Sequence, residues 1–157
     1  MADKSKLGME FPAFTYEVEK GKVAEFAMAI SQKESKEQVD QVYADQKAAK
    51  DAGYDDIIPP PTFQTCFALW GGGGLMPMIT ALGINLGRLL HGEEEYEYFK
   101  PVHPGDVITC QTKVTDIYEK EKKNKPGKFM EFTVLETEMK NQKGEVVIKS
   151  RSTLVER

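Results

Sequence analysis

The sequence predicts an α+β domain in which an antiparallel sheet wraps around a central apolar helix. Helical periodicity is confined to the early part of the chain, alternation of period two fills the later part, and an apolar run separates them. Helices grouped ahead of strands that are joined by short turns are typical of α+β domains. The length of 157 residues and the 40% hydrophobic content suit a single domain, residues 1–157, with its own core.

The segments before the apolar run predict one strand and two helices. Residues 1–10 are polar and are expected to form a flexible tail, and alternation over residues 14–18 predicts a short strand. Apolar residues then recur at the spacing i, i+3, i+4, i+7, which predicts an amphipathic helix over residues 20–31. The capping-box pattern SKEQ predicts a second, surface helix over residues 35–52.

The apolar run lies within residues 56–99, between three prolines and an acidic strand. It is apolar on all sides, so we expect a helix that is buried on every face. Its length of about 20 residues could cross a bilayer. However, Pro77, the glycines at 71–74 and Asn85 interrupt it, and no basic cluster flanks it. We therefore predict a core helix and no membrane partner.

Alternation of apolar and polar residues follows the central segment and continues to the end of the chain. Turns rich in proline, glycine and asparagine separate the alternating runs, so each run is predicted to be a strand. The predicted strands cover residues 93–99, 107–119, 129–139 and 145–154. A strongly twisted sheet curled around one apolar helix is the hot dog fold, which is the fold that we expect.

Charge and cysteine usage exclude several classes of site. A formal net charge of -4 and a pI near 5.3 argue against a nucleic-acid surface. Cys66 and Cys110 lie in apolar segments without metal-ligand spacing, so we expect reduced core thiols in a cytoplasmic protein. The N-terminal residues lack the hydrophobic region of a signal peptide. No pattern predicts a bound metal or cofactor.

Three motifs follow one another in the order PPTF, LLHGEEEYEY and PVHPGD. With the patterns around them, they make the chain resemble the MaoC-like dehydratases, and more narrowly the N-terminal FAS1-like dehydratase domain of that superfamily. The resemblance covers nearly the whole chain from Phe14. It implies a hot dog domain that pairs with another and binds an acyl-CoA or acyl carrier protein thioester at the interface. The implied reaction is reversible hydration of a trans-2-enoyl thioester.

One departure from the family pattern bears on catalysis. Catalytic members of the superfamily carry a D-x-x-x-x-H dyad between the first helix and the segment that leads into the central helix. Here that region reads AISQKESKEQVDQVYADQ, with Glu34 and Asp40 but no histidine. The two histidines, His91 and His103, lie elsewhere. The resemblance therefore implies the subunit without the dyad, either a homodimer in isolation or a heterodimer with a dyad-bearing hot dog chain.

His91 is the fallback catalytic candidate. It could lie near the thioester, oriented by Glu93 or Glu94, because the neighbours of a histidine decide whether it titrates usefully. The alternative is a histidine that bonds the backbone at a helix-to-strand turn, beside Gly92. His103 lies in an exposed turn, and we expect it to have no chemical role.

The remaining candidates lie in the central segment. Free amides at the helix start could bind a thioester oxygen or a pantetheine group, or the same residues could only cap the helix and fill the core. The four glycines could leave space for an acyl group, or form a kink where two elements pass closely. The lysine-rich loop at 118–128 could contact coenzyme A phosphates or simply be solvated. The predicted substrate-binding residues are Pro61, Thr62, Phe63, Trp70, Gly71, Leu75, His91 and Gly92.

Three functions remain open at this point. The leading one is a dyad-lacking subunit of an enoyl-thioester hydratase or 3-hydroxyacyl-thioester dehydratase, which binds part of the substrate beside a catalytic partner. The second is a self-sufficient homodimeric enoyl-CoA hydratase that uses His91. The third is a non-catalytic acyl-CoA-binding or scaffold module. Activity of the chain alone would favour the second, and activity only with a partner would favour the first.

Overall fold

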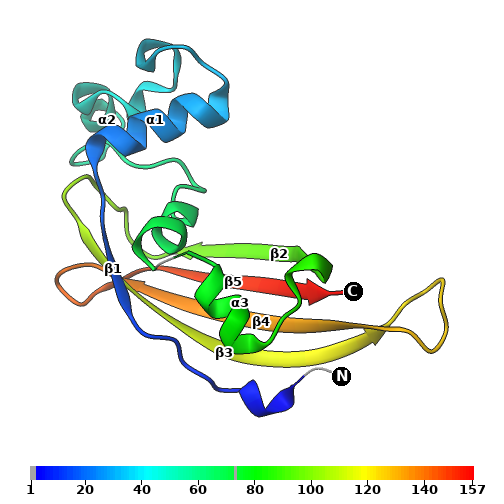
Figure 1. The fold of residues 1–157 in the computed structure, drawn as a ribbon. Helices are drawn as coiled ribbons and strands as arrows, with labels where there is room; N and C mark the ends of the chain where they lie inside the picture. The colour runs from blue at the N-terminus through cyan, green and yellow to red at the C-terminus, as the bar shows by residue number, and fades with distance from the viewer. Residues whose placement is uncertain (1–2, 73) are drawn as a thin grey trace.

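The computed structural model describes residues 3–72 and 74–157. Residues 1–2 of the expected tail and residue 73 of the four-glycine run lie outside the described residues. Five antiparallel strands form one sheet in the order β1-β3-β4-β5-β2 (Figure 1). The predicted α+β class is therefore confirmed. The strands are β1 (Phe14–Glu17), β2 (Leu89–Tyr98), β3 (Val107–Glu121), β4 (Phe129–Lys140) and β5 (Val146–Glu156).

Helical segments lie at one end of the sheet and across one of its faces. Helix α1 (Lys20–Ser31) and helix α2 (Gln46–Asp51) form a lobe at the end of the sheet, while α3 (Met76–Leu82) crosses its face (Figure 1). A π-helical turn at Phe67–Gly71 precedes α3. Single 3-10 turns cover Lys4–Lys6, Lys36–Gln38, Gln41–Tyr43 and Leu86–Arg88. No described helix has the length and apolar character to span a membrane.

The prediction for α1 is confirmed at both ends, but the second predicted helix is wrong. Two 3-10 turns and the short α2 replace the continuous helix expected over residues 35–52. Asp40 caps one of these turns by accepting from the Val42 amide at 3.2 Å, and Asp45 caps α2 by accepting from the Ala48 amide at 2.8 Å. Aspartate side chains that bond the local backbone compete with helix continuation, so each one begins a new turn.

The C-terminal end of α1 holds a strained residue. Gln32 adopts φ 54° and ψ 40°, and it is the one described residue other than glycine with positive φ. This left-handed conformation is unfavourable for side chains with a Cβ atom and natural for glycine. We expect Gln32→Gly to raise the free energy of unfolding by about 0.5–1 kcal/mol in chemical denaturation. Gln46→Gly, in the right-handed helix α2, should lower the free energy of unfolding. A lower free energy of unfolding for both variants would contradict the prediction.

The core lies between the sheet and the segment that leads into α3. Phe63 and Phe67 are buried, with ring centroids 5.9 Å apart, and Phe67 also contacts the Tyr16 ring of β1 at 4.8 Å. Phe26 of α1 lies edge-on to Phe63 at 5.4 Å. Aromatic edge-to-face contacts of this kind add to the burial of apolar area. One cluster thus joins the helical lobe to the sheet.

The central helix differs from the prediction, because it is neither continuous nor buried on every face. Trp70 is 75% exposed and Met76 is 53% exposed. Gly71 explains part of the break: a Cβ atom there would lie 2.9 Å from the Thr15 carbonyl oxygen, so only glycine fits so close to β1. The segment therefore covers the sheet with one side and leaves the other side open.

The residues that precede β1 are attached to the sheet. The Gly8 amide donates to the Val114 carbonyl at 2.9 Å, and the Val114 amide donates to the Met9 carbonyl at 2.9 Å. The Phe11 amide donates to Thr112 of the same strand at 2.9 Å. Residues 8–11, which include the end of the expected flexible tail, thus lie along β3.

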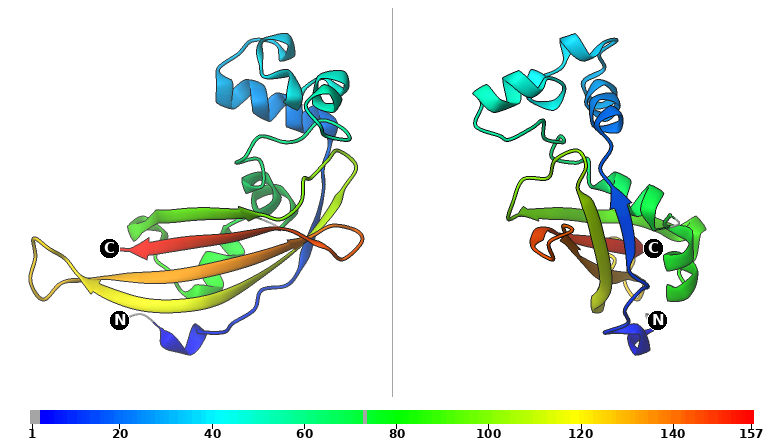
Figure 2. Two further views of the ribbon diagram at one scale, coloured as in Figure 1. Left: turned by 180° about the vertical axis from the view of Figure 1, so that it is seen from behind. Right: turned by 90° about the vertical axis from the view of Figure 1, so that its left-hand side faces the viewer.

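The outer face of the sheet is a solvated, charged surface. Figure 2 shows this face from behind, and no described helix covers it. One cross-strand row alternates in charge from strand to strand, which is a stabilising arrangement for opposed side chains. This row runs through Glu95, Arg151, Glu136, Lys113 and Glu10.

Candidate functional site

The cavity between the central segment and the inner face of the sheet has a volume of ≈ 430 Å³. We call it the sheet cavity. Its volume lies in the range of small-molecule sites, and most of its wall is apolar. The central segment contributes Gln64, Thr65, Phe67, Ala68, Leu69, Gly74, Leu75 and Met78, and β1 contributes Phe14. The other strands contribute Leu89, His91, Glu94, Tyr96, Cys110, Thr112, Leu135, Thr137, Met139, Ser150, Ser152 and Leu154.

A row of hydroxyl groups crosses the floor of the sheet cavity. Strand register places Thr112, Thr137, Ser150 and Tyr96 side by side on β3, β4, β5 and β2. The Thr112 and Thr137 hydroxyl oxygens lie 2.8 Å apart and share a hydrogen bond. Side chains at matching register positions face the same side of a sheet. The cavity therefore combines an apolar wall with polar groups across its floor.

His91 and Glu94 lie together at one end of the cavity. His91 Nε2 is 3.0 Å from Glu94 Oε2, and the Ser152 hydroxyl donates to the same carboxylate oxygen. In a regular strand, residues three apart point to opposite faces. Here the register shifts between His91 and Glu93, which leaves Gly92 as the extra residue of a β-bulge. The bulge therefore brings His91 and Glu94 to the same face.

Tyr96 and the two cysteines are held in their neutral forms. Burial, together with the negative charge of Glu94, raises the pKa of Tyr96 well above its ordinary value. Burial also raises the pKa of the Cys110 thiol to about 12, and that of the half-buried Cys66 thiol to a lesser extent. Neither cysteine is thus a thiolate near neutral pH, so cysteine nucleophile chemistry is not supported at this site.

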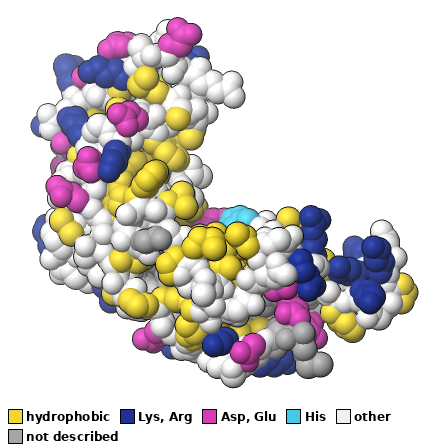
Figure 3. Space-filling view, in the orientation of Figure 1, with side chains coloured by type: hydrophobic (Ala, Val, Ile, Leu, Met, Phe, Trp, Pro, Cys, Tyr) yellow, Lys and Arg dark blue, Asp and Glu magenta, His cyan; other side chains and the backbone are white. Residues whose placement is uncertain are grey.

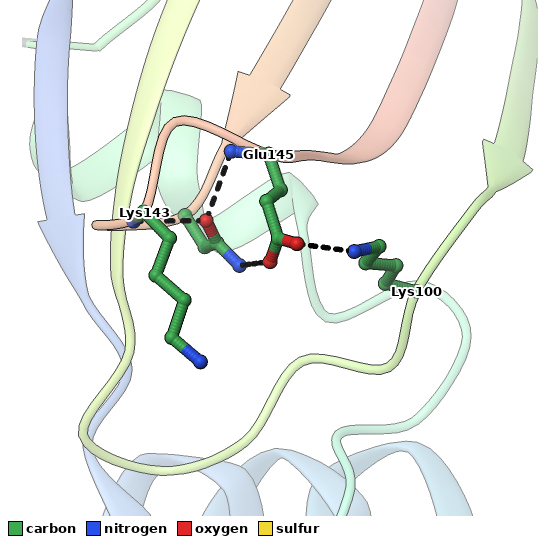
Figure 4. Close-up of polar contacts among 4 residues, drawn as sticks. Lys100, Lys143 and Glu145 are labelled. Atoms are coloured by element: carbon green, nitrogen blue, oxygen red, sulfur yellow. Dashed lines mark hydrogen bonds and ion pairs between the residues drawn. The ribbon is translucent and has the colours of Figure 1, made fainter.

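A second cavity of ≈ 370 Å³ lies beside the first, at the end of the sheet near the helical lobe. We call it the proline cavity. Lys100, on its wall, forms an ion pair with Glu145 of the β4–β5 turn, and Asn141 donates to the same carboxylate at 2.9 Å (Figure 4). These contacts lower the pKa of Glu145, the Lys100 bond most of all. The cavity is lined by Tyr54, Ile58, Pro59, Pro60, Pro61, Gln64, Phe67, Tyr98, Phe99, Lys100, Pro101, Val102 and Ile148.

The structure brings some of the predicted site residues to these cavities. Leu75 and His91 line the sheet cavity, and Pro61 lines the proline cavity. Of the two glutamates considered as partners of His91, Glu94 contacts it, whereas Glu93 pairs in register with Thr153 on the other side of the bulge.

Other predicted residues lie outside both cavities. Thr62 and Trp70 are exposed, Phe63 is fully buried in the core, and Gly71 lies against β1. Gly92 contributes by forming the bulge. A Cβ atom there would lie 2.7 Å from the Val155 side chain, so the position needs a glycine. Gly92 thus shapes the site without lining it.

Sequence reasoning missed several residues of the two cavities. Gln64, Tyr98 and Ser152 make side-chain hydrogen bonds there, and Tyr96 belongs to the hydroxyl row. The alternation over residues 93–99 places Tyr96 and Tyr98 on one face, but it does not show that this face lines the cavities. Nothing in the local pattern around Gln64 marks it, because its partner Tyr98 is 34 residues away in the chain.

The remaining candidates stand apart from the cavities. His103 Nδ1 donates to the Ile57 carbonyl at 3.1 Å and its amide donates to Asp106 at 2.8 Å, so it ties the β2–β3 turn to the extended segment. The predicted lysine-rich loop is wrong over residues 118–121, which belong to β3 and pair with β4. The remaining residues, 122–128, protrude beyond the last β4–β5 residue pair, Glu131 with Glu156 (Figure 3). Within residues 3–72 and 74–157, no group of three or more His, Cys, Asp or Glu side chains could hold a metal ion.

Comparison with known sequences identifies the family. Residues 5–150 match the model of the FAS1-like dehydratase domain region. A UPF0336 protein of Thermobifida fusca is 37% identical over 142 residues, which cover 90% of this chain and 84% of that protein. A UPF0336 protein of Saccharopolyspora erythraea is 33% identical over 156 residues, which cover 99% of this chain and 91% of that protein.

The fold of the chain is similar to that of solved proteins. A chain of the C-terminally truncated HadBC (3R-hydroxyacyl-ACP dehydratase) complex of Mycobacterium tuberculosis has a TM-score of 0.75 and 21% identity, with 96% of each chain covered. The (R)-hydratase of A. caviae has a TM-score of 0.65 and 18% identity, with 98% of each chain covered. The predicted hot dog fold is confirmed. The match over residues 5–150 shows that the chain, which has this fold, belongs to the FAS1-like dehydratase domain family.

Proposed function

We propose that this chain is the dyad-lacking subunit of an enoyl-thioester hydratase or 3-hydroxyacyl-thioester dehydratase. It binds the acyl part of an acyl-CoA or acyl-carrier substrate beside a catalytic hot dog partner. The observation that carries the proposal is a large, mostly apolar cavity in a chain whose dyad region contains no histidine. An apolar cavity binds an acyl chain through the hydrophobic effect, whereas hydration also needs a positioned acid and base.

The related structures support this assignment by analogy. The HadBC complex is a 3R-hydroxyacyl-ACP dehydratase, and the A. caviae protein is an (R)-hydratase. Fold similarity alone does not carry an activity from one protein to another. Substrate class and partner are therefore parts of the proposal.

A free strand edge and an apolar surface are available to the partner. Strand β2 forms one edge of the sheet over ten residues. Hydrophobic side chains gather beside it over α3 (Figure 3), and uncovered edges and apolar patches favour association. The exposed apolar residues of this region are Leu69, Trp70, Leu75, Met76, Leu86 and Leu90. We expect a homodimer in isolation and a heterodimer when a dyad-bearing chain is present.

The test is an assay of trans-2-enoyl-CoA hydration, followed by loss of the enoyl absorbance. We expect no turnover by this chain alone. When a dyad-bearing hot dog chain is added, turnover of long acyl chains should exceed that of the dyad-bearing chain alone. Turnover by this chain alone would overturn the proposal. Acyl-CoA binding without hydration in any combination would favour a scaffold module.

The contact between His91 and Glu94 favours a second candidate function. This pair faces the sheet cavity, its heavy atoms are 3.0 Å apart, and Ser152 holds the carboxylate. A histidine oriented by a carboxylate can act as a general base on water. A self-sufficient hydratase would therefore depend on this pair.

Two variants and one matched control test the second function. If the chain alone hydrates enoyl-CoA, we expect His91→Ala and Glu94→Gln to abolish turnover. Glu93→Gln should leave turnover unchanged, because Glu93 does not line the cavity. If all three variants hydrate enoyl-CoA as fast as the unmodified chain, the His91 mechanism is excluded.

A further inference from the structure

The sheet cavity and the proline cavity are neighbours along the same strands. One cross-strand row passes through Cys110, Met139, Ile148 and Tyr98 on β3, β4, β5 and β2. The first two residues of this row line the sheet cavity, and the last two line the proline cavity. The two cavities therefore meet above a single row of the sheet.

Two side chains, Gln64 and Phe67, line both cavities. Phe67 is fixed, because its ring contacts the rings of Tyr16 and Phe63 within the core cluster. Gln64 has no ring contacts, and hydrogen bonds hold its amide group. Its Nε2 donates to the Pro61 carbonyl and to the Tyr98 hydroxyl, and that hydroxyl donates to the same carbonyl. Gln64 is thus the part of the boundary that hydrogen bonds, rather than aromatic packing, hold in place.

The chemical character of Gln64 is unusual for its place. The residue is only 3% exposed and lies between two largely apolar spaces. A buried amide is unfavourable unless it is hydrogen-bonded, and an aliphatic side chain would fill the same wall without partners. The hydrogen bonds to Pro61 and Tyr98 hold the amide between the two cavities, and both partners line the proline cavity.

We propose that Gln64 is a gate between the sheet cavity and the proline cavity, and that its side chain sets the length of acyl group that the chain can bind. This inference rests on the proposed acyl-binding function. With Gln64 held by Pro61 and Tyr98, an acyl group is confined to one cavity. With the side chain shortened, the two cavities join into one longer channel.

The experiment measures binding of saturated acyl-CoAs of increasing chain length to the full chain by calorimetry. Each further buried methylene should strengthen binding by about fourfold, which corresponds to about 0.8 kcal/mol. For the unmodified chain, we expect affinity to rise with length and then level off when one cavity is full. For Gln64→Ala, affinity should continue to rise at lengths where the unmodified chain has levelled off.

A second variant keeps the test decisive if Gln64→Ala fails to fold. Tyr98→Phe retains the ring but removes the hydroxyl that holds Gln64, so it should move the limit to longer chains as well. Gln111→Ala is the matched control. Gln111 also donates to a backbone carbonyl, that of Phe11, at 2.7 Å, but it lines neither cavity. The affinity of Gln111→Ala should therefore depend on acyl chain length in the same way as that of the unmodified chain.

The outcomes separate the gate from the proposed function. If every protein binds acyl-CoA and all reach their limit at the same chain length, the gate is wrong while the acyl-binding function stands. If neither the unmodified chain nor the variants bind any acyl-CoA, the proposed function fails, and the gate fails with it. A longer limit in Gln64→Ala and Tyr98→Phe, but not in Gln111→Ala, is the expected result.

Discussion

Replacing Phe63 with alanine should lower the free energy of unfolding by about 3–5 kcal/mol, the range for large-to-small aromatic substitutions in a core. Phe63 is fully buried, and its ring contacts Tyr16, Phe26 and Phe67. These partners come from β1, α1 and the π-helical turn, so the cavity left by the ring would weaken the contact of the helical lobe with the sheet. Urea denaturation followed by circular dichroism measures the effect.

Phe129→Ala is the matched control for this variant. Phe129 lies at the start of β4 beside the protruding loop and is half exposed. Removing its ring leaves no buried cavity, so the free energy of unfolding should change by less than about 0.5 kcal/mol. A similar decrease in the free energy of unfolding for both variants would contradict the role of Phe63 in packing the helical lobe against the sheet.

Replacing Gly92 with alanine should lower the free energy of unfolding by about 1–3 kcal/mol, as for other overpacking substitutions. The new Cβ atom would lie 2.7 Å from the Val155 side chain and 3.1 Å from the Thr153 carbonyl oxygen. Val155 is buried and branched at Cβ, so it has little freedom to turn away. Relief of the clash would flatten the bulge, which would separate His91 from Glu94.

Thermal denaturation measures the stability change, and a crystal structure of the variant measures the distance between His91 and Glu94. Gly21→Ala provides the control, because no described atom outside the adjoining residues and helix backbone lies within 4 Å of a Cβ atom built there. Gly21 is in α1, where alanine has the better helix propensity, so this variant should gain up to about 1 kcal/mol. If Gly92→Ala leaves the thermal stability unchanged and His91 still contacts Glu94, the bulge does not depend on glycine.

Local patterns predicted most of the secondary structure of this chain. The helix over residues 20–31 and the strands after the central segment follow from the spacing of apolar residues, because burial on one face repeats with the period of the element. The prediction failed at residues 35–52, where it rested on the capping-box pattern SKEQ. There, Asp40 and Asp45 bond the backbone locally and divide the expected helix, and a capping box at the start of a segment does not exclude such competition later in it.

The candidate site was predictable only in part. The absence of a histidine from the dyad region and the proximity of His91 to acidic residues are visible in the sequence. The choice of Glu94 over Glu93 is not, because it depends on one extra residue in the register of β2 against β5. A shift of one residue moves a side chain to the opposite face.

The family, the α+β class and the order of the strands along the chain can be read from the amino-acid sequence, and so can the absence of a histidine from residues 29–46. Three features appear only once the chain is folded: the central segment leaves one side open, Gly92 brings His91 beside Glu94, and Gln64 meets Tyr98 between two cavities. Periodicity and capping act over a few residues, whereas bulges, cavity walls and hydrogen bonds between distant residues depend on how the strands are paired.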